Sequence, residues 1–211
     1  MLRAMPRQCG SNLLNRGQLL RRGAVGGGVV LSGSIFSAFA GRAGAATPSP
    51  SDNDLAYLRL LVAAELLAAD FQARALSSKR LNRPAKAVLG KMAADEKAHY
   101  TRLAQLVTAA GQPPATAGDI DFSYPKGSFA SQASVLKLAS EIETVVLGAY
   151  LGAIESVEAA ELRLPIGEIA ANEAQHAGAL AALRGRSVIG RAFAPTLQID
   201  AASAALDRFE S

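Results

Sequence analysis

The sequence predicts an all-α fold: a four-helix bundle with one long crossover between its second and third helices and a short helix at the C-terminus. Three observations lead to this prediction. Half of the 211 residues are apolar and only 5% are aromatic, with alanine and leucine dominant, which favours helices. Apolar residues recur at helical spacing in four long stretches. The connections between these stretches are short, long and short, as expected for two antiparallel helix pairs joined by a crossover.

Each helical stretch starts or stops at a capping, proline or glycine signal. We expect helices from about Asp54 to Ser77, from about Pro84 to Ala110, from about Ser131 to Glu158, and from Pro165 to the residue before Gly185. Proline is favoured in the first turn of a helix and glycine just past its end, which sets the bounds of the fourth. The segment between the second and third helices is long for a compact domain. The residues FAPTLQIDAASAALDRF (193–209) predict a loop and a short closing helix.

Residues 1–46 have the features of an export signal that is cleaved, residues 47–53 those of a linker, and residues 54–211 form the folded domain. The signal contains basic residues, then the uncharged run AVGGGVVLSGSIFSAFA and the small-residue stretch RAGAA. We therefore expect an exported bacterial protein, periplasmic or extracellular, whose mature form has no stable membrane span. An organellar presequence and an uncleaved anchor are the alternatives. NRGQLLR (15–21) resembles the twin-arginine box with Gly17 in place of an arginine, so the twin-arginine and general secretory routes both stay open.

The net charge of +4 belongs to this leader. It holds six arginines and no acidic residue, which leaves 16 of the 22 Lys and Arg for the rest of the chain, against all 18 Asp and Glu. The domain is therefore slightly acidic, and nucleic acid is not an expected partner. Cys9 is the sole cysteine and lies in the leader, so the mature protein would have neither a disulfide nor a thiolate metal ligand.

Both histidines of the chain follow a glutamate by three residues, in DEKAHY (95–100) and NEAQHAG (172–178). Residues three apart share a face of a helix, so Glu96 lies beside His99 and Glu173 beside His176. A single motif of this kind more often forms a surface ion pair. Its use by both histidines, in apolar surroundings, argues against that interpretation here.

Each motif is preceded, at nearly the same spacing, by a lone glutamate on the helix before it, Glu65 or Glu143. The helical neighbours of both are apolar, whereas Glu141, the competitor of Glu143, has mixed and wetter neighbours. Carboxylates in a core are normally paired or bound to metal. A glutamate from two helices and Glu-x-x-His from two others is the ligand set of di-iron and di-manganese four-helix bundles. The predicted metal ligands are Glu65, Glu96, His99, Glu143, Glu173 and His176.

Two divalent metal ions would balance the charge of four carboxylates and two imidazoles. Oxygen-rich sites with imidazole suit iron or manganese, with zinc as an alternative. Glu–His pairs that only form hydrogen bonds are the metal-free alternative. Tyr100 and Tyr150 are candidate donors beside the ligands. Plain core packing is the preferred interpretation of Tyr100, and the two interpretations stay open for Tyr150.

Several segments resemble the ferritin-like domain family of exported bacterial proteins and plant desiccation-related proteins. AAELLAADF (63–71) resembles its helix-1 motif L-E-x-L-E-x-x-F, with Ala68 at the second acid. IETVVLGAYLGA (142–153) resembles its helix-3 motif L-E-x-x-x-V-x-A-Y-x-G-A, with Leu147 at the usual valine. IAANEAQHAGALAALRG (169–185) is similar to the helix-4 motif, and DFSYPKGSF fits the crossover.

The resemblance implies a ferritin-like bundle that binds a dinuclear Fe or Mn centre through the six residues named above. It does not define an activity, because the wider superfamily includes oxidases, peroxidases, manganese catalases and iron stores. One hypothesis is an oxidoreductase acting on peroxide or dioxygen in oxidative or desiccation stress. The other is a non-catalytic stress or envelope protein that keeps the fold. A storage cage is less favoured, since the sequence shows no assembly signal, and a homodimer stays open.

Overall fold

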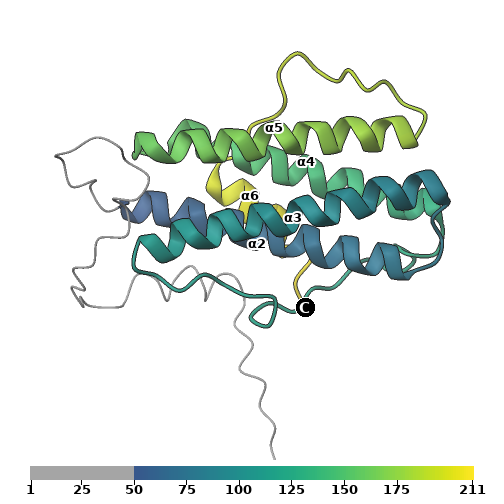
Figure 1. The fold of residues 1–211 in the computed structure, drawn as a ribbon, viewed down its shortest axis with the longest axis horizontal. Coiled ribbons are helices and arrows are strands. Elements are labelled where there is room, and N and C mark those ends of the chain that lie inside the picture. Colours follow the sequence, from purple (N-terminus) through teal and green to yellow (C-terminus); the bar gives the residue numbers. More distant parts are fainter. Residues whose placement is uncertain (1–49) are drawn as a thin grey trace, which may run out of the picture.

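The computed structural model describes residues 50–211, which form four long helices and one short helix (Figure 1). The helices are α2 (Asp52–Ser77), α3 (Arg83–Ala109), α4 (Gln132–Ser156), α5 (Ala160–Leu183) and α6 (Ile199–Asp207). Within the described residues there is no β-strand, so the predicted all-α class is confirmed. None of the helices in this part of the chain is long and apolar enough to cross a membrane. The predicted export signal, residues 1–46, lies outside the described residues.

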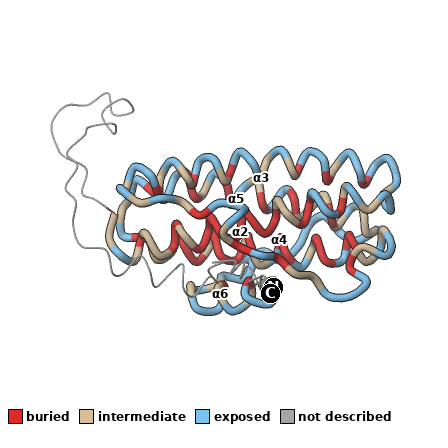
Figure 2. The backbone as a smooth tube through the Cα atoms, turned by 90° about the horizontal axis from the view of Figure 1, so that it is seen from below, coloured by how far each residue is buried: buried red, intermediate tan, exposed pale blue. Residues whose placement is uncertain are grey.

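The four long helices form two antiparallel pairs, α2 with α3 and α4 with α5 (Figure 1). The segment between α3 and α4 runs the length of the bundle, as the sequence predicted, and α2 packs against α4 while α3 lies beside α5. Short α6 packs against α2 and α4. Buried residues follow the inner faces of the long helices, and exposed residues follow their outer faces (Figure 2).

The crossover is held against α2 by aromatic side chains. The ring centroid of Tyr124 lies 5.7 Å from that of Phe71 and 5.4 Å from that of Phe129, which it meets edge-on, and the Tyr124 hydroxyl donates to Asp70 Oδ2 at 2.8 Å. Burial first, and then the neighbouring Asp70 carboxylate, raise the pKa of Tyr124, which keeps its hydroxyl a donor. The crossover is therefore a packed part of the domain. It is anchored to α2 through Phe71 and Asp70.

Two helix starts differ from the sequence prediction. Helix α2 begins at Asp52, inside the predicted linker, because Ser51 caps it and forms a capping box with Asp54. Helix α5 begins at Ala160, so the start predicted at Pro165 is wrong and this proline lies inside the helix. The residues before Pro165 are good helix formers, and a proline near the helix start removes only one internal hydrogen bond. The buried carboxylate of Asp54 also accepts the backbone N–H of Glu158, just before α5, at 2.7 Å.

The loop between α5 and α6 comes very close to α4. The backbone N–H of Leu197 donates to the carbonyl of Gly148 at 2.9 Å. A Cβ atom at Gly152 would lie 2.0 Å from the carbonyl oxygen of Leu197, which is far inside van der Waals contact. Only glycine allows this approach, so Gly148 and Gly152 fix where α6 docks on the bundle.

Candidate metal centre

The six residues predicted as ligands meet in the middle of the bundle. The glutamates come one from each long helix, and the histidines from α3 and α5, because Glu-x-x-His places two side chains on one helical face. Each glutamate is at most 1% exposed, His99 is 8% exposed and His176 is 4% exposed. All six lie among apolar core residues, and they are Glu65, Glu96, His99, Glu143, Glu173 and His176.

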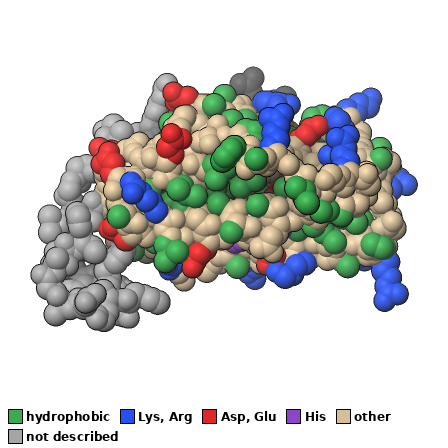
Figure 3. All heavy atoms as spheres, turned by 90° about the horizontal axis from the view of Figure 1, so that it is seen from above, with side chains coloured by type: hydrophobic (Ala, Val, Ile, Leu, Met, Phe, Trp, Pro, Cys, Tyr) green, Lys and Arg blue, Asp and Glu red, His purple; other side chains and the backbone are tan. Residues whose placement is uncertain are grey.

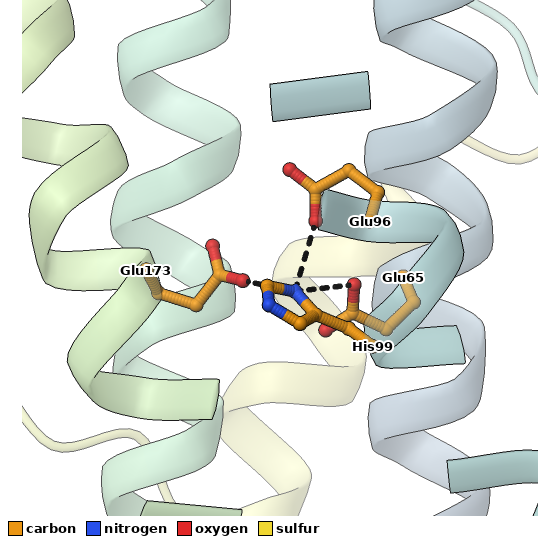
Figure 4. Close-up of side chains that lie close together, drawn as sticks. All are labelled: Glu65, Glu96, His99 and Glu173. Carbon is orange, nitrogen blue, oxygen red and sulfur yellow. Dashed lines mark ion pairs between the residues drawn. The ribbon is translucent and has the colours of Figure 1, made fainter. Parts of the chain in front are cut away.

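The first group of ligands surrounds His99. Its Nδ1 atom lies 2.8 Å from Glu173 Oε1, 3.4 Å from Glu96 Oε2 and 3.5 Å from Glu65 Oε2. Figure 4 shows these side chains pointing toward one another, with Glu173 coming from the opposite helix pair. One ligand atom from each of the four residues lies within 4.8 Å of the others, a separation that lets them bind one ion together.

The second group surrounds His176. Its Nδ1 atom lies 3.3 Å from Glu173 Oε2, 3.3 Å from Glu96 Oε1 and 3.6 Å from Glu143 Oε2. These four residues also offer ligand atoms within 4.8 Å of one another. Glu96 and Glu173 belong to both groups, and each presents one oxygen to His99 and the other to His176. The centre therefore consists of two adjacent groups that could each hold a metal ion and that share two carboxylates.

The unpaired polar atoms of the centre test whether metal ions would fit. Several buried atoms lie near one another but form no hydrogen bond of acceptable geometry. Such atoms are unfavourable in a core unless something else binds them. Four carboxylates and two neutral imidazoles carry four negative charges, which two divalent cations would neutralise. The unpaired atoms are Glu65 Oε2, Glu96 Oε1 and Oε2, Glu143 Oε2, Glu173 Oε1 and His99 Nδ1. The donor set thus fits two divalent ions.

Without metal, the residues of the centre balance their charge with protons. Burial raises the pKa of Glu65 and of Glu143 well above the usual range. Burial alone would lower the pKa of His99, but the close carboxylates around it, led by Glu173, raise it to about 12. His176 is shifted in the same direction for the same reason. Burial opposes the ionised form of Glu173, yet the two histidines outweigh it and lower its pKa to about 2. Metal binding would displace these protons.

Two donors reach the centre from equivalent positions on α2 and α4. The Tyr150 hydroxyl donates to Glu65 Oε1, and Gln72 Nε2 donates to Glu143 Oε1 at 3.3 Å. Each donor lies about two turns after the lone glutamate of its own helix and reaches the glutamate of the other. Tyr150 is thus beside the ligands. Tyr100 is not, because its hydroxyl donates to the carbonyl of Ala115 in the crossover, which corrects its place among the candidate donors.

Sequence reasoning missed Asp95. Its Oδ2 atom lies 3.4 Å from Nε2 of His176, across from α3 to α5, while Lys91 pairs with its other oxygen. Burial would raise the pKa of Asp95, but Lys91 and His176 outweigh burial and lower it. A carboxylate on the outer nitrogen of a ligating histidine orients the ring and raises its basicity. The available signal was that Asp95 directly precedes Glu96 of one Glu-x-x-His motif. Adjacent residues of a helix point in different directions, so this position alone did not place Asp95 beside a histidine.

The centre is buried but not sealed from one face of the bundle. Asp95 is 18% exposed at its side chain, and His99 retains partial exposure. Figure 3 shows a small patch of histidine at the surface, and both histidines of the chain belong to the centre. The centre therefore comes closest to the surface at Asp95 and His99.

A four-helix bundle with a glutamate from two helices and Glu-x-x-His from two others defines the class of ferritin-like carboxylate proteins. The family model described as ferritin-like domain matches residues 53–186, and the chain belongs to this family. No curated protein matches the chain. The narrower likeness to exported and desiccation-related members stays a prediction.

Proposed function

We propose that the protein binds two divalent metal ions, iron or manganese, at the six-residue centre and acts as an oxidoreductase on peroxide or dioxygen. The observation that carries this proposal is the pair of overlapping ligand groups that share Glu96 and Glu173. A purely structural network of hydrogen bonds would not need two carboxylates shared between two groups. The arrangement of the centre also leaves several buried carboxylate oxygens without a hydrogen bond. The export signal predicted at residues 1–46 supports a role outside the cytoplasm in oxidative or desiccation stress.

Two Fe or Mn ions bound at this centre would supply redox chemistry at coordination positions that the protein does not fill. The residues of the chain provide the surroundings for it. Glu96 and Glu173 hold the two positions side by side, and Asp95 orients the ring of His176. Tyr150 and Gln72 fix the lone glutamates. The apolar core around the centre excludes bulk water, and a small oxidant would enter where Asp95 and His99 approach the surface.

Elemental analysis of protein recovered from its natural compartment tests metal binding directly. We expect about two Fe or Mn per chain, lost in a variant with Glu96→Ala and Glu173→Ala together. The matched control is Glu141→Ala, which removes an exposed glutamate of α4 that pairs with Lys137 and should keep full metal content. Zinc in place of iron or manganese would contradict the redox proposal and leave only the metal site.

Peroxide consumption by the metal-loaded protein tests turnover. We expect the loaded protein to consume peroxide much faster than the variant that lacks Glu96 and Glu173, and the Glu141→Ala control to match the unaltered protein. Equal rates for the metal-loaded protein and the variant that lacks Glu96 and Glu173 would rule out the oxidoreductase.

Fractionation of the source cells tests whether the protein is exported. The mass of the mature N-terminal peptide tests whether residues 1–46 are cleaved.

A second candidate is a non-catalytic stress or envelope protein that keeps the fold without turnover. One observation favours it: His99 Nδ1 lies 2.8 Å from Glu173 Oε1, and the raised pKa of His99 lets the pair balance its own charge without metal. This candidate predicts that deleting the gene reduces survival on drying and that the variant lacking Glu96 and Glu173 restores it. Failure of that variant to restore survival would argue for the metal-dependent function.

A further inference from the structure

The loop between α5 and α6, residues 184–198, projects from the bundle beyond α5 (Figure 1). Its two ends are fixed. The chain leaves α5 at Gly185, which has a φ of 65°, and Arg186 N–H donates back to the carbonyl of Ala181 at 2.9 Å. It returns at Leu197, bonded to Gly148 of α4. Between these anchors, residues 190–196 form no hydrogen bond to the rest of the described chain. Hydrogen bonds to α5 and α4 therefore fix both ends of the loop, while its middle part extends away from the bundle.

Large apolar side chains are exposed along this loop. Val188 is 60% exposed, Ile189 is 83% exposed and Phe193 is 89% exposed. The other large hydrophobic residue with comparable exposure in residues 50–211 is Leu164 on α5, at 70%. Val188, Ile189 and Phe193 lie within six residues of one another along the loop, and apolar side chains grouped on a surface mark a contact with another apolar phase or molecule. Nothing in the described part of the bundle covers them.

The same loop carries positive charge. Arg184, Arg186 and Arg191 alternate with the apolar residues, and the sequence holds no acidic residue between Glu173 and Asp200. In the described part of the chain none of these arginines forms an ion pair. The domain as a whole is slightly acidic, so the loop is a local basic region on an otherwise acidic protein. Figure 3 views the side from which the loop projects, and both basic and hydrophobic side chains are exposed on this face.

We propose that residues 184–198 form a membrane-docking loop that binds the surface of an anionic lipid bilayer. Basic side chains are attracted to anionic headgroups, and exposed aromatic and aliphatic side chains enter the boundary between headgroups and acyl chains. This mode of binding needs no membrane-spanning helix, and no helix in residues 50–211 could span. The charge complementarity selects an anionic lipid surface over a neutral one. The inference does not depend on the metal centre.

Single tryptophans introduced into the full chain report where the loop lies, because the natural sequence has no tryptophan. The probe is Phe193→Trp, and the matched control is Leu164→Trp at the other exposed apolar position. Vesicles of phosphatidylglycerol mixed with phosphatidylcholine should shift the indole fluorescence of the Phe193→Trp protein to shorter wavelength and shield it from iodide. The fluorescence of the control should not change. This local readout separates the loop from any lipid binding by residues 1–46.

Charge variants test the preference for anionic lipid. Replacing Arg186 and Arg191 by glutamine in the Phe193→Trp protein should weaken vesicle partition roughly 30-fold, and added salt should weaken it as well. Because these side chains are exposed, the helical circular dichroism signal should remain unchanged.

Three results would overturn the membrane proposal. The first is fluorescence of the Phe193→Trp protein that does not respond to vesicles. The second is an equal response to phosphatidylcholine alone, which would remove the role of charge. The third is a shift that depends on protein concentration without vesicles, which would assign the loop to contact between copies of this chain.

Discussion

The two helix pairs, α2 with α3 and α4 with α5, contribute the same ligands to the centre but surround them differently. Each pair supplies a lone glutamate and a Glu-x-x-His motif. The lone glutamate of α2 accepts a hydrogen bond from a phenol, Tyr150, and that of α4 from an amide, Gln72. Asp95 stands directly before the motif of α3 and contacts His176, whereas Asn172 stands directly before that of α5.

The difference shows that the inner ligands and the groups that orient them are separable. Both ion positions need a carboxylate and an imidazole, but a carboxylate can accept its outer hydrogen bond from any donor. The two positions are therefore not equivalent. His176 has a carboxylate on its outer nitrogen, and within the described residues Asn172 forms no hydrogen bond to His99. We expect the Glu143–His176 position to bind metal more tightly.

The largest expected effect distinguishes shared from unshared ligands. Glu96→Ala should remove both ions, because this carboxylate belongs to both groups. Glu65→Ala and Glu143→Ala should each remove only the ion of their own half. Metal content per chain, measured by elemental analysis after loading with Mn²⁺, checks this. Retention of one ion by Glu96→Ala would contradict the bridging role of that residue.

A second effect concerns packing on the outer faces of the two pairs. Gly152→Ala should lower the free energy of unfolding by about 3 kcal/mol, because its new Cβ would overlap the backbone of Leu197. Gly90→Ala in α3 is the control, since nothing lies within 4 Å of its Cβ position. It should stabilise the protein by about 0.5–1 kcal/mol, because alanine is the better helix former. Denaturant unfolding measures both, and equal effects would show that Leu197 does not press on α4.

A third effect exchanges the outer groups of the two halves. Asp95→Asn should weaken metal binding at the Glu143–His176 position about 10–100-fold, because His176 loses the carboxylate on its outer nitrogen. Asn172→Asp tests whether the other half can gain that carboxylate, and the affinity at the Glu65–His99 position should then rise. Competition titrations with a metal-binding dye measure the two steps. If Asp95→Asn changes both steps equally, the two positions are coupled rather than distinct.

The last effect, which is small within a fraction of a pH unit, is the pH dependence of metal binding. In the metal-free protein the pKa values of His99 and His176 are raised, and those of Glu65 and Glu143 are raised as well. A raised pKa favours the protonated form of each group, and metal binding must displace the protons that these groups carry. Affinity should therefore rise with pH, by about tenfold per pH unit for each proton released.

Calorimetry in buffers of different ionisation enthalpy counts the released protons at fixed pH. The Glu65→Ala protein is the control for this count, because only the His176 half should still bind metal and release protons. Binding without proton release would show that these residues are already deprotonated before metal arrives.

Much of this protein follows from local patterns in its sequence. Apolar periodicity and caps predicted the long helices and the crossover, because helix formation depends on neighbours within a few residues. The same periodicity predicted that four glutamates and two histidines face inward. Pro165 was misread because a favoured first-turn residue is also tolerated slightly further inside, where good helix formers precede it.

The tertiary structure alone decided how the inward side chains meet. A sequence pattern shows which face of a helix a residue occupies, but not how the helices are rotated against one another. For that reason the bridging positions of Glu96 and Glu173, the contact of Asp95 with His176, and the choice of Tyr150 over Tyr100 all required the assembled bundle. Contacts between helices depend on distances that only packing sets.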